Sequence, residues 1–134
     1  MSFLREHKNG LRVVGAFILL GIGMISAEIW HLYYLFYWYD MMMHTIGGIC
    51  LGLLGVYLVE HTWVMYSTKT LKQKIIFILC IGFVGGIFLE IYEFLIHITL
   101  QIVTQPSWAD TVSDIMFDTL GTGLIAMYYF IRKF

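Results

Sequence analysis

The sequence is poor in charged side chains, and that shortage argues against most soluble protein classes. Only 13% of its 134 residues are charged, whereas 60% are hydrophobic. A soluble domain carries about 25% charged residues, so this chain has too few to cover a globular surface. Only two cysteines argue against a disulfide scaffold. A net charge of −1 without a basic run argues against a nucleic-acid partner. We therefore expect a small integral membrane protein whose first partner is the lipid bilayer.

Long apolar stretches are what the sequence has instead. They cover residues 13–30, 41–63, 75–100 and 112–131. Each has about 18–26 residues, and a helix of that length, about 27–39 Å, spans the hydrocarbon core of a bilayer. The runs are continuous rather than alternating, which disfavours barrel strands. We predict an all-α, integral membrane four-helix bundle that forms one transmembrane domain over residues 1–134.

The basic residues predict the orientation of this bundle. With four spans, the N-terminus, the second connection and the C-terminus lie on one side of the membrane. That side receives all eight basic residues, which are Arg5, Lys8, Arg12, Lys69, Lys72, Lys74, Arg132 and Lys133. The positive-inside rule then places both termini in the cytoplasm, in a multi-pass protein of the cytoplasmic (inner) membrane. The other side carries a belt of aromatic residues: Trp30, Tyr33, Tyr34, Tyr37, Trp38, Tyr39 and Trp108.

Carboxylates and histidines concentrate at the outer ends of three spans. The set comprises Asp40, His44, Glu90, Glu93, His97, Asp110, Asp114 and Asp118. An ionised carboxylate inside a membrane is energetically costly, and the outer side of the sequence has no Lys or Arg to pair with these residues. We expect the set to form one functional site. The alternative is a polar hydrogen-bond network that only holds the helices together.

The spacing of these residues places them on helix faces that also carry small residues. Within each span they are three or four positions apart, so they share one face. Each face continues inward into small residues, which are Gly48 and Gly52, Gly82 and Gly86, and Gly121 and Thr122. Small residues four positions apart let helix backbones approach closely. We therefore expect these faces to pack together, with the acids inside the bundle rather than toward lipid.

A divalent cation would neutralise such a site, and protonated carboxyls with trapped water are the alternative. Helical bundles build metal sites from carboxylates and imidazoles on facing helices. Oxygen ligands with one or two nitrogens suit Zn, Mn, Fe or Mg, and the two histidines count against Ca²⁺. All eight residues are metal-ligand candidates. Asp40 and Asp110 have the alternative role of capping a helix, and His97 that of lying at the interface. We interpret Glu28 and His31 as a solvated helix end.

Three motifs resemble those of a known group of proteins. They are Asp40-Met-Met-Met-His44 with Gly47-Gly48, Glu90-Ile-Tyr-Glu93, and Asp114-Ile-Met-Phe-Asp118-Thr-Leu-Gly121. In order and spacing they resemble the small VanZ-like and YjdF-like bacterial membrane proteins, over residues 38–125. Asp118 stands where VanZ-like proteins usually have asparagine, and the arginine that often precedes their last span is missing here. The resemblance implies a polytopic bacterial membrane protein, linked in some relatives to glycopeptide resistance, and no settled reaction comes with it.

The function that we expect is binding of a divalent cation. If the protein is an enzyme, the reaction is metal-assisted hydrolysis or group transfer on a lipid or lipid-linked substrate. Glu93 or Asp118 would then be the catalytic base that takes a proton from water. Two alternatives stay open: a cation or proton channel or transporter that uses the carboxylates as its ion site, and a non-catalytic accessory protein. A homo-oligomer is compatible with each of them.

Overall fold

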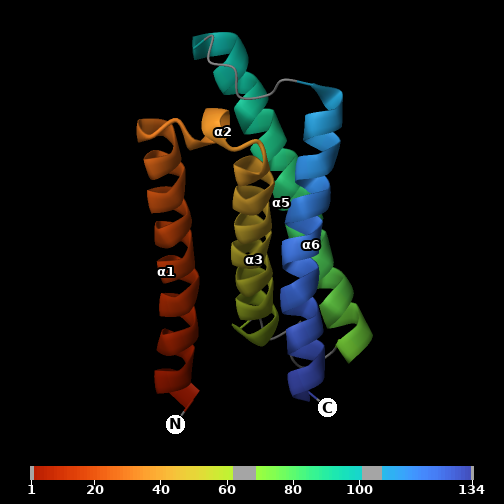
Figure 1. Cartoon of the computed structure of the whole chain (residues 1–134). Coiled ribbons are helices and arrows are strands. Elements are labelled where there is room, and N and C mark those ends of the chain that lie inside the picture. Colours follow the sequence, from red (N-terminus) through yellow and green to blue (C-terminus); the bar gives the residue numbers. More distant parts are fainter. Residues whose placement is uncertain (1, 62–68, 101–106, 134) are drawn as a thin grey trace.

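Helices account for the regular structure of the described part of the chain. The computed structural model describes residues 2–61, 69–100 and 107–133, without the side chains of residues 2–9, 96, 97, 100 and 133. Its elements are α1 (Ser2–Ile29), α2 (Leu32–Leu35), α3 (Trp38–His61), α5 (Leu71–Leu100) and α6 (Trp108–Lys133) (Figure 1). The predicted all-α class is confirmed for these residues.

Three of the helices are long and apolar enough to cross a membrane. Their candidate spans are Gly10–Ile29, Trp38–His61 and Leu71–Leu95, which correspond to the first three predicted stretches. The protein is therefore a membrane protein whose helices contact the lipid bilayer. Helix α6 is not among these three, since the aspartates on it lower its mean hydropathy. A fourth crossing stays a prediction.

Several helices begin earlier than the predicted stretches, because hydropathy does not set where a helix starts. The N–H of Thr70 donates to Gln73 Oε1 at 2.9 Å, and the N–H of Gln73 donates to Thr70 Oγ1 at 3.3 Å. This capping box starts α5 about one turn before residue 75. Ser107 Oγ accepts from the N–H of Asp110 at 3.2 Å, so Ser107, and not Asp110, caps α6. Helix α1 begins at Ser2, since polar residues continue it beyond its apolar segment.

The helices form a core of three, α3, α5 and α6, with α1 on the outside of α3 (Figure 1). The core helices contact one another in all three pairs, whereas α1 contacts chiefly α3 and the short α2. Among the described side chains of α1, only Ala27 is buried. The arrangement thus differs from an evenly packed four-helix bundle. Hydropathy could not foresee this, because an apolar helix suits lipid contact as well as protein contact.

The predicted small-residue faces are contact surfaces between the core helices. A Cβ atom at Gly48 of α3 would overlap the backbone carbonyl of Asp118 in α6, and one at Gly121 would overlap the carbonyl of Thr45 in α3. The Thr122 hydroxyl lies 2.8 Å from the Gly48 carbonyl oxygen, and it occupies the space that a side chain at position 82 would need. These close approaches confirm that the faces carrying the acids face one another.

Charge and polarity differ between the two ends of the bundle. The N- and C-termini lie at the same end (Figure 1), and the basic residues belong to the start of α1, the start of α5 and its preceding residues, and the end of α6. An apolar cluster of Val59, Ile78, Ala126 and Tyr129 fills the core toward this end. The opposite end, which carries α2, holds seven of the nine acidic residues, whereas Glu6 and Glu60 belong to the basic end. The basic residues are therefore separated from the acidic site, as predicted. Which end of the bundle faces the cytoplasm stays a prediction.

Candidate metal centre

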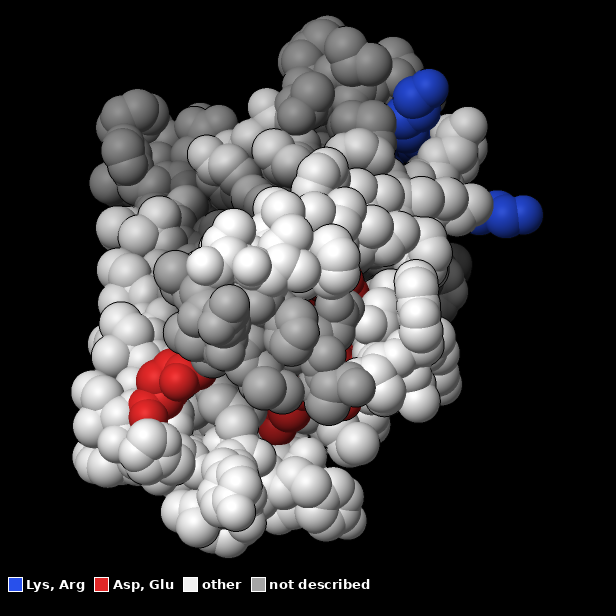
Figure 2. Space-filling view, turned by 90° about the horizontal axis from the view of Figure 1, so that it is seen from above, with Lys and Arg blue, Asp and Glu red and all other residues white. Residues whose placement is uncertain are grey.

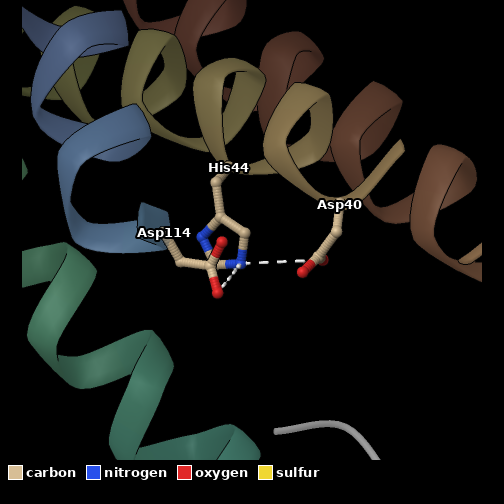
Figure 3. A group of neighbouring side chains, drawn as sticks. All are labelled: Asp40, His44 and Asp114. Atoms are coloured by element: carbon tan, nitrogen blue, oxygen red, sulfur yellow. Dashed lines mark ion pairs between the residues drawn. The ribbon is translucent and has the colours of Figure 1, made fainter. Parts of the chain in front are cut away.

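His44 of α3 lies at the centre of a group of carboxylates from all three core helices. On one edge of its ring, Nδ1 lies 3.1 Å from Asp118 Oδ2. On the other edge, Nε2 faces Glu93 Oε1 at 3.5 Å, Asp40 Oδ1 at 3.8 Å and Asp114 Oδ2 at 3.9 Å. Figure 3 shows the two ion pairs that reach Nε2 from α3 and α6. One imidazole therefore connects α3 to both α5 and α6.

Two overlapping groups of residues around this imidazole could hold a metal ion. The first comprises Asp40, His44 and Asp114, and the second comprises His44, Glu90 and Glu93. Within each group the three ligand atoms lie within 4.8 Å of one another. Because both groups include His44, they belong to one centre rather than to two separate sites.

Most of the predicted ligand residues meet at this centre. Those brought together are Asp40, His44, Glu90, Glu93, Asp114 and Asp118. Asp110 is half-buried and belongs to neither group of ligand atoms. The side chain of His97 lies outside the described residues, so its predicted role stays a prediction. Glu28 and His31 are exposed, in agreement with a solvated helix end.

The carboxylates of this centre differ in how far they are buried. Asp118 and Asp114 are almost completely buried, at 0% and 1% exposure. The side chains of Glu93 and Asp40 are 18% and 29% exposed. Figure 2 views the bundle from the α2 end and shows acidic atoms (red) on that face, whereas Lys and Arg (blue) are visible only at the edge of the outline. Asp40 and Glu93, rather than Asp114 and Asp118, are therefore the more accessible members of the centre.

The charges at this centre do not balance. Five carboxylates surround a single imidazole, and every Lys and Arg of the sequence belongs to the opposite end of the bundle. A protonated His44 would neutralise only one of the five negative charges. Buried charges without a counter-charge are too costly to persist, so the centre requires protons or a bound cation.

Asp118 occupies a niche that glycines create. Its carboxylate lies between α3 and α5, where a Cβ at Gly86 would be 2.9 Å from Oδ2 and one at Gly47 would be 3.3 Å from Oδ1. Oδ1 is buried and has no hydrogen-bond partner among the described residues. Asp118 thus lies deeper than the other carboxylates and on the far edge of the His44 ring, although the sequence placed it in the same stripe as Asp114.

Sequence reasoning missed one residue near this centre, Tyr33 of α2. His31 precedes this one-turn helix with a left-handed backbone at φ 53°, and the Tyr33 ring packs edge-on against Tyr39 with ring centroids 5.4 Å apart. Burial raises the pKa of the Tyr33 phenol, and the negative charges of Asp40 and Glu93 raise it further. Both effects favour the neutral phenol beside these carboxylates. In the sequence, Tyr33 looks like another aromatic residue of the membrane interface, because a helix as short as α2 shows no hydrophobic periodicity.

The site is closed on its inner side by tight packing. Thr122 lies directly below Asp118, with its hydroxyl 2.8 Å from the Gly48 carbonyl and 3.0 Å from the Asp118 carbonyl. No side chain fits at Gly82 because Thr122 fills that space. Farther along, the core consists of the apolar cluster that contains Val59 and Ile78. The polar centre is therefore bounded by a packed layer toward the basic end.

Comparison with known proteins assigns the chain to a family. Residues 9–133 match the family described as predicted membrane protein (DUF2238). No curated protein and no solved structure gives a significant match. The family match supports a small membrane protein without singling out the VanZ-like or YjdF-like proteins, so that resemblance stays a prediction. Because the match covers nearly the whole length, the chain belongs to the DUF2238 family of predicted membrane proteins.

Proposed function

We propose that this protein binds a divalent metal ion at the centre around His44. The observation that carries the proposal is that the two nitrogens of the His44 ring face different carboxylates. Asp118 occupies Nδ1, while Nε2 is directed at Asp40, Glu93 and Asp114. A histidine that ligates a metal through one nitrogen almost always donates a hydrogen bond from the other, often to a carboxylate.

The spacing of the atoms around Nε2 supports a metal ion rather than a hydrogen-bond network. The separations from Nε2 to Asp40 and Asp114, 3.8 and 3.9 Å, are too long for hydrogen bonds, and the 3.5 Å to Glu93 is longer than an ordinary one. Ligands at about 2.0–2.2 Å from one ion are separated from one another by about 3–3.5 Å, so the ligand groups, whose atoms lie within 4.8 Å of one another, would contract around an ion. One nitrogen and several carboxylate oxygens suit Zn, Mn, Fe or Mg.

The surface of α6 supports a fourth crossing of the membrane. Its buried face carries polar residues, among them Asp114, Asp118 and Thr122. Its exposed face carries a continuous apolar row, which is Val112, Met116, Leu120, Leu124, Met127 and Ile131. A helix with polar residues inside and apolar residues outside suits lipid, and 26 residues extend about 39 Å. Four crossings and the positive-inside rule together favour cytoplasmic termini and an outward-facing metal centre in the inner membrane.

The reaction that fits this centre is hydrolysis or group transfer on a lipid or lipid-linked substrate. A bound divalent ion would polarise a substrate oxygen and acidify a water molecule. Glu93 is partly exposed and has the carboxylate oxygen nearest Nε2, so it is the best-placed proton acceptor. The fully buried Asp118 is less accessible to substrate. A centre that opens at the outer end of a membrane bundle is accessible to molecules anchored in the outer leaflet.

Conduction of cations or protons is the weaker alternative. The packed layer at Thr122 and the apolar cluster below it leave the carboxylates as a closed-ended site within one chain. Ion flux into liposomes tests this alternative directly, and it includes the case of a pore formed by several chains. A non-catalytic accessory role would require the cluster to fold the protein without any bound ion.

Metal content tests the proposal. Detergent-purified wild type, loaded in turn with Zn, Mn, Fe and Mg, is analysed by inductively coupled plasma mass spectrometry beside a Glu90→Gln/Asp114→Asn double variant. Glu28→Gln is the matched control, since Glu28 is an exposed carboxylate at the same end. We expect stoichiometric metal in wild type and control and its loss in the double variant. Wild type that retains none of the four metals would end the proposal.

A further inference from the structure

We infer that Asp118 is a positioning residue, which holds His44 as the Nδ1–H tautomer and keeps the lone pair of Nε2 directed at the metal centre. This inference deepens the proposed function and rests on it for the metal. It separates Asp118 from the other carboxylates, which face Nε2, and assigns it neither ligation nor proton transfer.

The geometry of the ring supports this role. Asp118 Oδ2 lies 3.1 Å from Nδ1, whereas the oxygens of Glu93 and Asp114 lie near Nε2. The two ring nitrogens direct their hydrogen or lone pair to opposite edges of the imidazole. Asp118 therefore cannot reach an ion bound at Nε2 without abandoning Nδ1. A carboxylate accepts hydrogen bonds and a neutral imidazole carries one N–H, so acceptance from Nδ1–H leaves Nε2 free to ligate.

Contacts on its main chain and its side chain hold Asp118 in place. Its backbone carbonyl lies against Gly48 of α3 and 3.0 Å from the Thr122 hydroxyl. Its side chain lies in the niche formed by Gly47 and Gly86. Since the residue is 0% exposed, water cannot compete for Oδ2. Both the main chain and the side chain of Asp118 are therefore held by the helices that carry the metal ligands.

Nuclear magnetic resonance of ¹⁵N-labelled histidine, combined with zinc titration, tests the inference. His44→Gln identifies the His44 resonances among those of the other histidines. In zinc-loaded wild type we expect a protonated Nδ1 and a metal-bound Nε2. Asp118→Ala should weaken zinc binding about 10–100-fold and lose this signature. Asp118→Asn should retain most of the zinc affinity and the Nδ1–H signature, because the amide oxygen still accepts from Nδ1–H. Glu28→Gln, which changes an exposed carboxylate at the same end of the bundle, is the control.

The outcomes separate this inference from the proposed function. Zinc bound by Asp118→Ala with wild-type affinity and an unchanged Nε2 signature would overturn the inference and leave the metal site intact. Wild type that binds no zinc would end the metal proposal. The tautomer of His44 would still decide the role of Asp118, since an Nε2–H tautomer would overturn the inference. If Asp118→Ala does not fold, Gly86→Ala displaces the carboxylate without removing it. That variant should also weaken zinc binding, and unchanged binding would count against the inference.

Discussion

Replacing Gly48 with alanine tests the close approach of the α3 and α6 backbones. The new Cβ would lie 2.7 Å from the carbonyl carbon and 2.8 Å from the Cα atom of Asp118. These atoms belong to the backbone, so no change of side-chain rotamer relieves the overlap. The helices must move apart, and the bond from the Thr122 hydroxyl to the Gly48 carbonyl must lengthen.

The expected effect on the free energy of unfolding combines three contributions. Overpacking in a well-packed core costs about 1–3 kcal/mol. Loss of the Thr122 bond adds about 0.5–1.5 kcal/mol. The higher helix propensity of alanine offsets about 1 kcal/mol of this. We therefore expect Gly48→Ala to destabilise the protein by about 0.5–3.5 kcal/mol.

Gly123 provides the matched control for this substitution. It lies in α6, and a Cβ there would meet no atom within 4 Å, so Gly123→Ala should gain up to about 1 kcal/mol from helix propensity alone. Unfolding of both variants in mixed micelles, driven by an increasing fraction of dodecyl sulfate and followed by circular dichroism, gives the comparison. If Gly48→Ala is as stable as Gly123→Ala, the backbones of α3 and α6 do not approach each other closely at Gly48.

Three further results are expected from the same geometry. His44→Gln should abolish metal binding measured by mass spectrometry. His61→Gln should leave it unchanged, because His61 lies at the opposite end of the bundle, where its Nδ1 bonds to a backbone carbonyl. Equal metal retention by both variants would contradict the role of His44 as a ligand. Thr122→Val should lower the free energy of unfolding by about 0.5–1.5 kcal/mol, and Thr119→Val should lower it much less. Thr122 bonds across helices, whereas Thr119 bonds only within its own helix. The same unfolding assay distinguishes the two variants. Removal of metal with EDTA should lower the free energy of unfolding by about 2.7 kcal/mol relative to protein at a metal concentration of 100 times Kd, and stability that does not respond to metal would argue that the folded state binds none.

The sequence predicted the helices well and their starting residues poorly. Continuous apolar runs identify a helix that crosses a membrane, but they mark where the bilayer begins and ends. The first residue of α5 depends instead on the side chain of Thr70, which pairs with Gln73. Ser107 performs the same task for α6. A search for capping-box spacing would have found both starts, whereas the one-turn helix α2 offers no such signal.

The membership of the candidate site was predictable for a different reason. Residues four positions apart share a helix face, and Gly48 and Gly121 show which faces can approach. What the sequence could not provide is the rotation of each helix about its axis. That rotation decides that Asp118 lies at Nδ1 of His44 while Asp114 lies at Nε2. The peripheral position of α1 was equally hidden, because lipid-facing and protein-facing apolar residues are chemically alike.

The arrangement around Nε2 of His44 also bears on whether the cluster is only structural. A hydrogen-bond network needs donors as well as acceptors, and an ionised carboxylate supplies acceptors alone. Oxygens of Asp40, Glu93 and Asp114 converge on one nitrogen that carries at most one hydrogen. That hydrogen cannot serve all three, whereas a cation among them contacts every oxygen at once. If these carboxylates are ionised, they therefore need a cation among them, as the proposed metal centre provides, whereas a network that only joins helices needs some of them protonated.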